Sequence, residues 1–274
     1  MGEDAFPRTL VENVSLPRLL IGSNSFCGFS HYSAARSKWL REYFTVERIA
    51  EVVSFFVDHG IDAYLGGPRE ESRLACLEAQ ERTGKPVTLI LTPSGKTKEE
   101  LERNIDLCAE WGAKICMPHV SYTDSHMVVS ENRILDLEDH VKRIRGHGMI
   151  PGLSTHMAET LKVALRGGYD VACIIQMLNP IGFLCSVETD WIVRAIRQCP
   201  KPVIAIKPLG AGRVLPSTGI RFAYNSIKPI DMVCIGTMSV HEAKEDVELA
   251  LEAMGAIAEQ ERELQVTRSK EALL

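Results

Sequence analysis

The residues best suited to chemistry stand where short apolar segments of the sequence end. His119 follows residues 114–118, and a histidine in that setting can act as a general acid or base or donate a hydrogen bond to a substrate carbonyl. Lys207 ends the apolar segment 203–207, so its ammonium must reach solvent, an anion or a carboxylate, because an unpaired buried charge is costly. Three roles are open for Lys207: a phosphate contact, a Schiff-base nucleophile or a structural salt bridge.

Two glycine-containing segments follow the last two apolar stretches of the chain. They read Gly210-Ala-Gly212-Arg213 and Ile235-Gly-Thr-Met-Ser239. Backbone N–H groups in such loops, with a helix N-terminus behind them, can bind phosphate, and Arg213 would add a cation. The alternative is that the glycines only form turns. We therefore expect a phosphate or dinucleotide site built from Gly210, Gly212, Arg213, Gly236, Thr237 and Ser239.

A metal site is not predicted. His119, His156 and Asp124 are residue types that bind metals, but the H-x-H pair of many metal-dependent barrel hydrolases is absent from the first apolar segment. His156 begins an expected helix, where it could equally cap the helix or face solvent. The other histidines on expected helices, His59, His140, His147 and His241, are predicted to lie at the surface.

Eight rounds of an apolar segment followed by an amphipathic segment span most of the chain. The expected strands are residues 18–22, 61–65, 87–92, 114–118, 149–153, 171–177, 203–207 and 232–236. The expected helices are residues 46–59, 69–83, 98–111, 136–147, 157–166, 188–198, 218–227 and 240–254. Continuous apolar strands that alternate with helices are typical of a parallel sheet covered on both faces.

These elements predict an α/β protein with a single (β/α)8 TIM-barrel domain. Eight rounds fit a closed barrel better than a doubly wound sheet, whose first loop usually carries G-x-G-x-x-G. Here that loop begins Gly22-Ser-Asn-Ser-Phe-Cys-Gly28. We expect the barrel to span residues 1–255, with a long first loop at residues 23–44 and a charged tail or helix at residues 256–274. The first loop is basic and could be a lid over an anionic ligand, a surface loop or a partner contact.

Composition excludes several classes of protein. The chain has 274 residues, 31 basic and 36 acidic, and its net charge of −5 argues against nucleic-acid binding. No apolar run is long enough to span a membrane, and the N-terminus lacks the pattern of a signal peptide, so we expect a cytoplasmic protein. The eight cysteines form no C-x-x-C pair and are expected to be reduced and packed as small apolar residues. The oligomeric state is not indicated.

The second half of the sequence resembles the aldo/keto reductases. Gly152-Leu-Ser-Thr-His156, Ile174-Ile-Gln-Met177, residues 206–212 and residues 235–246 resemble consecutive segments of that family, and His119 falls where its catalytic histidine ends the fourth strand. The resemblance implies a barrel enzyme that uses NADP(H) to reduce a small carbonyl compound. It implies that the cofactor is held by Ser154, Thr155, Gln176, Lys207, Gly210, Gly212, Arg213, Gly236, Thr237 and Ser239.

The family's catalytic set of Asp, Tyr, Lys and His is only partly present. Tyr64 is the candidate tyrosine, but it lies inside the expected strand 61–65 rather than after it, and Asp62 is also early. The lysine expected after the third strand is replaced by Leu91-Thr-Pro-Ser94. The candidate catalytic residues are thus His119, Tyr64 and Lys207. Two alternatives remain: a lyase, aldolase or isomerase that acts on a phosphorylated compound through Lys207, and a barrel that binds a ligand without catalysis.

Overall fold

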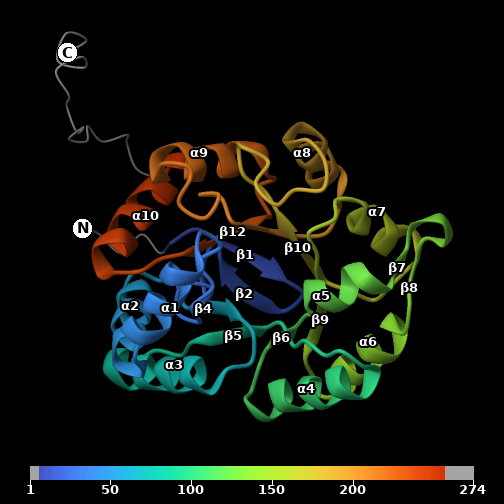
Figure 1. The fold of residues 1–274 in the computed structure, drawn as a ribbon, viewed down its shortest axis with the longest axis horizontal. Coiled ribbons are helices and arrows are strands. Elements are labelled where there is room, and N and C mark those ends of the chain that lie inside the picture. The colour runs from blue at the N-terminus through green and yellow to red at the C-terminus, as the bar shows by residue number, and fades with distance from the viewer. Residues whose placement is uncertain (1–5, 257–274) are drawn as a thin grey trace, which may run out of the picture.

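The computed structural model describes residues 6–256 and contains a closed barrel of eight parallel strands (Figure 1). The barrel strands are β3 (Leu19–Gly22), β4 (Ala63–Gly66), β5 (Thr88–Leu91), β6 (Ile115–Cys116), β9 (Ile150–Ser154), β10 (Cys173–Met177), β11 (Val203–Ile206) and β12 (Met232–Gly236). They pair in chain order, and β12 closes the barrel against β3 through Val233 opposite Leu19. The predicted single-domain (β/α)8 barrel is confirmed.

A ring of helices surrounds the strands (Figure 1). The helices that follow the barrel strands are α2 (Val46–Asp58), α3 (Glu70–Thr83), α4 (Lys98–Glu110), α6 (Leu137–Gly146), α7 (Glu159–Arg166), α8 (Thr189–Gln198), α9 (Pro216–Ser226) and α10 (Val240–Ala253). Every expected strand and helix is present, with ends within two residues of the predicted ones. The sequence patterns therefore located all sixteen elements of the barrel.

Local signals explain why the boundaries could be predicted. Thr97 and Ser239 cap α4 and α10, where their hydroxyls accept hydrogen bonds from the backbone N–H groups of Glu100 and Glu242. Five glycines that stand between a helix and the next strand have positive φ: Gly60, Gly84, Gly112, Gly148 and Gly168. An L side chain is strained in that conformation, so glycine ends these helices at little cost.

Strand alternation divides the core into two layers. One cluster fills the barrel interior and includes Leu20, Ile90 and Ile204. The other lies between the strands and the helices and includes Ile21, Phe56 and Val233. Because successive residues of a strand point to opposite faces, alternate residues of each strand belong to the inner and the outer layer. A residue's parity along its strand therefore decides whether it faces the barrel interior or the helices.

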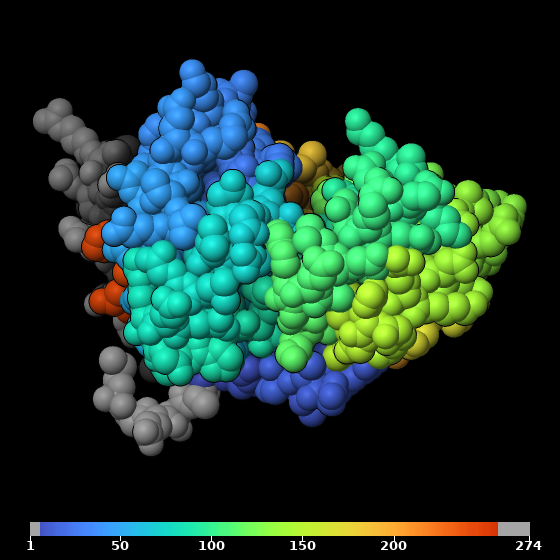
Figure 2. All heavy atoms as spheres, turned by 90° about the horizontal axis from the view of Figure 1, so that it is seen from below, coloured from blue at the N-terminus to red at the C-terminus, as the bar shows by residue number. Residues whose placement is uncertain are grey.

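A β-hairpin that the sequence patterns did not predict closes one end of the barrel. β1 (Arg8–Val11) pairs with β2 (Val14–Pro17), and Val11 and Leu16 are buried against the barrel interior. The hairpin precedes β3 directly, so it lies at the amino ends of the strands, and Figure 2 shows it in dark blue beneath the molecule. Arg145 of α6 pairs with Glu12 at its turn. With this end blocked, a ligand must enter from the carboxyl ends of the strands.

Two β-α connections contain structure that was not expected. The first, residues 23–44, holds α1 (Ala34–Tyr43), and Figure 2 shows this segment rising at the end of the molecule opposite the hairpin. The fourth contains α5 (Val120–Thr123), η1 (Asp124–His126), β7 (Met127–Val128), η2 (Val129–Glu131) and β8 (Arg133–Ile134). Apart from Ala256, the expected charged tail at residues 256–274 lies outside the described residues.

Other expectations can be compared with the described residues. Over residues 6–256, no helix has the length and apolar character needed to cross a bilayer. All eight cysteines are free thiols, six of them buried. The prediction that His140 lies at the surface is wrong, because its side chain is fully buried beneath α5 and its Nε2 lies 3.0 Å from the Tyr122 hydroxyl.

Candidate active site

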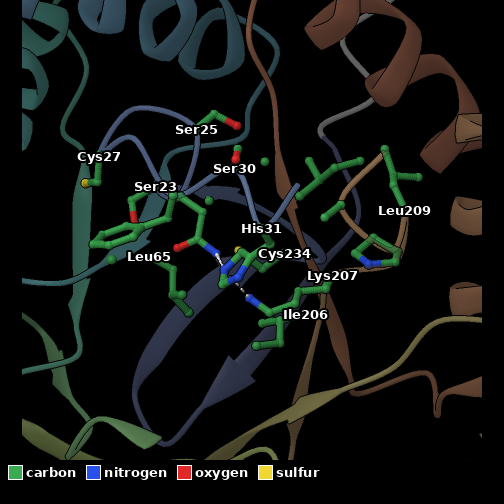
Figure 3. A pocket seen from close by; sticks show the side chains of 18 of the residues that line it. Ser23, Ser25, Cys27, Ser30, His31, Leu65, Ile206, Lys207, Leu209 and Cys234 are labelled. Carbon is green, nitrogen blue, oxygen red and sulfur yellow. Dashed lines mark hydrogen bonds between the residues drawn. The ribbon is translucent and has the colours of Figure 1, made fainter. Parts of the chain in front are cut away.

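A cavity of about 900 Å³ opens at the carboxyl ends of the barrel strands. Its walls come from residues at or just after several strand ends: Gly22, Gly66, Thr92, His119, Ser154, Lys207 and Gly236. The first β-α connection adds a further wall through Ser25, Cys27 and His31 (Figure 3). This is the end of a (β/α)8 barrel at which enzymes place their active sites. The cavity is large enough for a cofactor-sized ligand.

Lys207 is one of several basic residues that line one side of this cavity. Its Nζ lies 3.2 Å from Nε2 of His31, which reaches across from the first connection (Figure 3). Nδ2 of Asn24 approaches the same His31 nitrogen at 3.5 Å. Burial lowers the pKa of Lys207. Lys207 and His31 both have positive φ, +59° and +49°, which is a strained conformation for residues with side chains and is found mostly where function requires it.

His119 has a defined tautomer. The backbone N–H of Ser121 donates to Nδ1 of His119 at 3.2 Å, and the Ser121 hydroxyl lies 2.9 Å from the same atom. Nδ1 must therefore accept, so the proton of the neutral ring sits on Nε2. Burial, followed by the charge of Lys207, lowers the pKa of His119 and favours this neutral form. His119 thus offers an N–H donor at the end of β6.

His156 follows β9 and completes the basic group. Its backbone N–H donates to Oδ2 of Asp124 at 3.0 Å, and the Thr155 hydroxyl donates to the other oxygen of the same carboxylate. Burial, with the charges of Lys207, His119 and His31, lowers the pKa of His156 to about 4. The four basic residues His31, His119, His156 and Lys207 therefore act electrostatically on one another. Within the described part of the chain, no carboxylate forms an ion pair with any of these four side chains.

The structure brings together some of the predicted site residues and leaves others outside the cavity. Those that line the cavity are His119, Ser154, Lys207, Gly212, Arg213 and Gly236. Those that do not line it are Tyr64, Thr155, Gln176, Gly210, Thr237 and Ser239. Metal binding was not expected, and within the described part of the chain no group of three or more His, Cys, Asp and Glu residues could hold a metal.

Tyr64 lies outside the cavity because of its parity on β4. Its neighbours Ala63 and Leu65 point into the barrel, so Tyr64 points outward, into the layer between strands and helices. Its side chain is 1% exposed, and burial raises the pKa of its hydroxyl well above the ordinary value despite the nearby hydroxyls of Ser72 and Ser23. The structure therefore does not bring this tyrosine to His119 and Lys207, as the expected catalytic set requires.

Gln176 and Thr155 also face away from the cavity. Gln176 has the same parity on β10 as Ile174, in the outer layer, whereas Ile175 reaches the cavity. Its side chain is fully buried, and its Oε1 has no partner. The Thr155 hydroxyl is occupied by Asp124 and lies 2.8 Å from the Thr160 hydroxyl. Thr155 therefore holds the chain in place where β9 meets α7 and offers no group to a ligand.

The connection after β11 forms a tight loop that binds mainly to itself. Its residues Gly210, Ala211 and Gly212 all have positive φ. The backbone N–H groups of Gly212 and Arg213 donate to the carbonyl of Leu209, so they do not form an open anion nest. Arg213 donates to the carbonyls of Gly210 and His31 and stacks on the ring of Phe183, 4.2 Å from its centroid. Arg213 thereby fastens the first connection to this loop.

The connection after β12 supplies both a glycine wall and acidic groups. A Cβ at Gly236 would lie 3.4 Å from the Ser25 hydroxyl, so the missing side chain leaves space in the cavity. Glu242, Glu245 and Asp246 also line the cavity. Asp246 accepts a hydrogen bond from the Thr237 hydroxyl at 2.9 Å, and burial raises its pKa to about 8. Asp246 is therefore mostly neutral at pH 7.

Three cavity residues could not be identified from the sequence patterns as part of one site. His31 and Arg36 lie in the first connection, far from the other site residues in sequence, and Asp246 lies on α10 among exposed carboxylates. Arg36 approaches the Met238 sulfur at 3.8 Å, next to the beginning of α10. The one relevant signal was the basic character of residues 23–44. That character was compatible with a lid over an anionic ligand, a surface loop or a partner contact, and it did not indicate which side chains would reach the cavity.

Solved structures share this fold at low sequence identity. A putative aldo-keto reductase from Pseudomonas aeruginosa has 12% identity and a TM-score of 0.67, with 92% of this chain and 96% of that chain covered. An aldo/keto reductase from Klebsiella pneumoniae, solved in complex with NADP and acetate, has 12% identity and a TM-score of 0.55, with 98% and 94% covered. A dihydrodipicolinate synthase has 12% identity and a TM-score of 0.50, with 79% and 72% covered.

Comparison of the sequence with known proteins identifies no family. No family model matches the chain, and a search of curated proteins also gives no match. At such identities the structural matches establish the fold, and the fold supports both a reductase and a synthase in the structures above. The chain is a single-domain (β/α)8 barrel with the fold of the aldo-keto reductases.

Proposed function

We propose that this protein is a reductase of the aldo/keto type that uses NADP(H) to reduce a small carbonyl compound. The observation that supports this most is His119, which lines the cavity between β6 and α5 with its Nε2 proton available to a ligand. A neutral imidazole can polarise a carbonyl by donating a hydrogen bond to its oxygen. The fold that the chain shares with aldo-keto reductases also supports a reductase function.

The side of the cavity formed by β11, β12 and the first connection fits an extended nucleotide. Gly212 and Gly236 carry no side chains there, and a Cβ at Gly212 would meet no atom within 4 Å. Arg36 provides a guanidinium beside the beginning of α10, where a cofactor phosphate would be favoured. Asp246 opposes that phosphate little, because its raised pKa keeps it mostly neutral, so Glu242 and Glu245 are the acidic groups that Arg36 would have to offset. When bound, the nicotinamide supplies the hydride.

Residues of the chain then orient the carbonyl group and stabilise the negative charge that develops on its oxygen. His119 donates a hydrogen bond from Nε2 to the carbonyl oxygen, and the alkoxide that forms on hydride addition takes its proton from water. Ser121 holds the imidazole in the required tautomer through two contacts to Nδ1. The positive charge of Lys207 stabilises negative charge as it develops on the oxygen. Tyr64 has no part in this chemistry, because its hydroxyl lies on the outer side of β4.

A fluorescence titration with NADPH tests the proposal. Saturable quenching of tryptophan emission at micromolar cofactor is expected, with binding weakened about tenfold or more in Arg36→Met, because a phosphate loses its cation. Arg133→Met is the matched control, since Arg133 is exposed and pairs with Glu131 away from the cavity. Absence of binding up to millimolar NADPH and NADH would reject the reductase function.

One observation favours a second function, a lyase or aldolase. The lowered pKa of Lys207 increases the fraction of free amine, which is the form that attacks a carbonyl. The amine would add to the carbonyl carbon and water would leave, giving an imine. Borohydride would reduce that imine to a stable secondary amine, and mass spectrometry of the peptide containing Lys207 would detect it. An unmodified Lys207 after treatment with carbonyl compounds and borohydride would remove this alternative.

A further inference from the structure

We infer that the pair formed by Lys207 and His31 is a subsite for the anionic group of a small carbonyl substrate, such as the carboxylate of a 2-oxo acid. The inference deepens the proposed function and rests on it for the role of His119. It names the class of substrate, which neither the shared fold nor the expected cofactor determines.

The first support is the set of hydrogen-bond partners at Lys207. An ammonium has three N–H donors, and His31 Nε2 is the single acceptor within reach among the described residues. The amide nitrogen of Asn24 also approaches His31 Nε2, at 3.5 Å, so two N–H groups converge on the single lone pair of that ring nitrogen. Two donors of the Lys207 ammonium are thus left to face the cavity. The oxygens of an anionic group, a carboxylate or a phosphate, can accept from these two donors.

The second support is the unbalanced charge at this end of the barrel. His31, His119, His156 and Lys207 influence one another, and Arg213 adds a further positive charge at His31. Among the described residues no carboxylate pairs with these side chains: Asp124 contacts only the backbone of His156, and the acidic residues that line the cavity lie on α10. The lowered pKa values keep the three histidine rings mostly neutral, so the positive charge here belongs to Lys207 and Arg213, and an anion placed beside Lys207 would balance it. The cavity is therefore complementary to an anion on this side.

The third support is the set of contacts and the strained backbone conformation that position His31. The first connection crosses to the loop after β11, where Arg213 donates to the His31 carbonyl at 3.2 Å. The strained positive φ of both Lys207 and His31 aims two distant side chains at one point. The Lys207–His31 contact is not a salt bridge, so it does not offset the cost of the strained backbone. A ligand bound where the two side chains converge would offset that cost.

His119 places the second end of the substrate. His119 and Lys207 line the same cavity, so the Nε2 donor of His119 and the Lys207 ammonium face one enclosed space. A carbonyl oxygen at His119 and an anionic group at Lys207 would define one short substrate that bears both. A 2-oxo acid has this form, and a small carbonyl compound with a phosphate group shares its chemistry.

Calorimetric titration of the full chain with pyruvate and butane-2,3-dione tests the subsite, with and without NADP⁺ present. The two compounds have similar shapes, but only pyruvate carries a charge. We expect pyruvate to bind at least tenfold more tightly than the dione in the wild type. We expect Lys207→Met to remove this preference and Lys38→Met to keep it, because Lys38 pairs with Glu42 at the surface of α1. Equal binding of the two compounds to the wild type would overturn the inference.

A charge-conserving variant separates an anion subsite from imine formation. Lys207→Arg keeps a cation but cannot form an imine, so it should bind pyruvate within a few-fold of the wild type if the subsite only holds charge. Loss of binding in Lys207→Arg, in a variant that melts at the wild-type temperature, would overturn the inference. His31→Gln provides a second variant and should weaken pyruvate binding several-fold without altering that of the dione.

Competition with inorganic phosphate distinguishes the two anionic groups. Displacement of pyruvate by millimolar phosphate would assign the subsite to a phosphate-bearing carbonyl compound, and lack of displacement would assign it to a carboxylate. The result is independent of the nucleotide titration. A protein that binds no NADPH but still prefers pyruvate through Lys207 would retain the subsite and lose the reductase function. A protein that binds NADPH but binds pyruvate and the dione equally would retain the reductase function and lose the subsite.

Discussion

His31 and Lys207 are 176 positions apart in the sequence, yet their side-chain nitrogens lie 3.2 Å apart at the mouth of the barrel. The contact joins the first β-α connection to the end of β11 and defines the basic side of the cavity (Figure 3). Because Arg213 also binds the backbone of His31, the connection is fixed to the loop after β11 at two points. The first connection is thus part of the site itself.

Replacing His119 tests its assignment as the group that polarises the carbonyl. His119→Leu should lower kcat by about 10²- to 10⁴-fold, the usual range for loss of a positioned acid or base, while NADPH affinity stays unchanged. Ser121→Ala should cost less than about tenfold, because the Ser121 backbone N–H still fixes the tautomer. Steady-state kinetics with a reducible carbonyl compound measures both. His147→Gln, a change at an exposed residue, is the control, and a His119 variant with full activity would exclude the role.

Gly22 is required by close packing between β3 and β12. A Cβ there would lie 2.7 Å from the carbonyl oxygen of Ile235, which is backbone and cannot move without disturbing the barrel. Gly22→Ala should therefore lower the free energy of unfolding by about 2 kcal/mol, as overpacking commonly does. Urea denaturation measures it. Gly146→Ala is the matched control, because no atom lies within 4 Å of its Cβ position, and it should leave stability equal or up to about 1 kcal/mol higher.

His156 should make the protein sensitive to mild acid. Its pKa is about 4 in the folded chain against an ordinary 6.5, so between these values the unfolded state binds more protons. The free energy of unfolding then falls as pH falls from 6.5 to 4, by roughly 2 kcal/mol after allowance for partial exposure. His156→Gln should reduce that slope in urea titrations at several pH values. A variant with the wild-type slope would show that His156 is not the responsible group.

Asp246 should have the opposite effect at higher pH. Burial raises its pKa to about 8 from an ordinary 3.8, so between these values the folded state binds more protons and stability falls as pH rises. Asp246→Asn keeps an acceptor for the Thr237 hydroxyl but cannot ionise. Relative to the wild type, it should gain about 1 kcal/mol or more between pH 5 and pH 8. Glu245→Gln, at an exposed position on the same helix, should show no such change, and a flat Asp246→Asn difference would contradict the assignment.

The sequence by itself determined the barrel. Apolar segments, capping residues such as Thr97 and Ser239, and glycines such as Gly60 mark each strand and helix locally, so their limits could be predicted to within two residues. The order of the elements then allowed one closed sheet. The β1–β2 hairpin and α1 were missed because they are short or lie in a polar connection, where periodic patterns give no clear signal.

The tertiary structure alone decided which side chains share the cavity. His119 and Lys207 were predicted to be near it because they end strands, and they are. Tyr64 and Gln176 were predicted to join them but face outward, since a shift of one residue along a strand reverses the direction of a side chain. His31 and Arg36 enter the cavity because a long connection folds back over the barrel, a path set by distant contacts such as that between Arg213 and the His31 carbonyl.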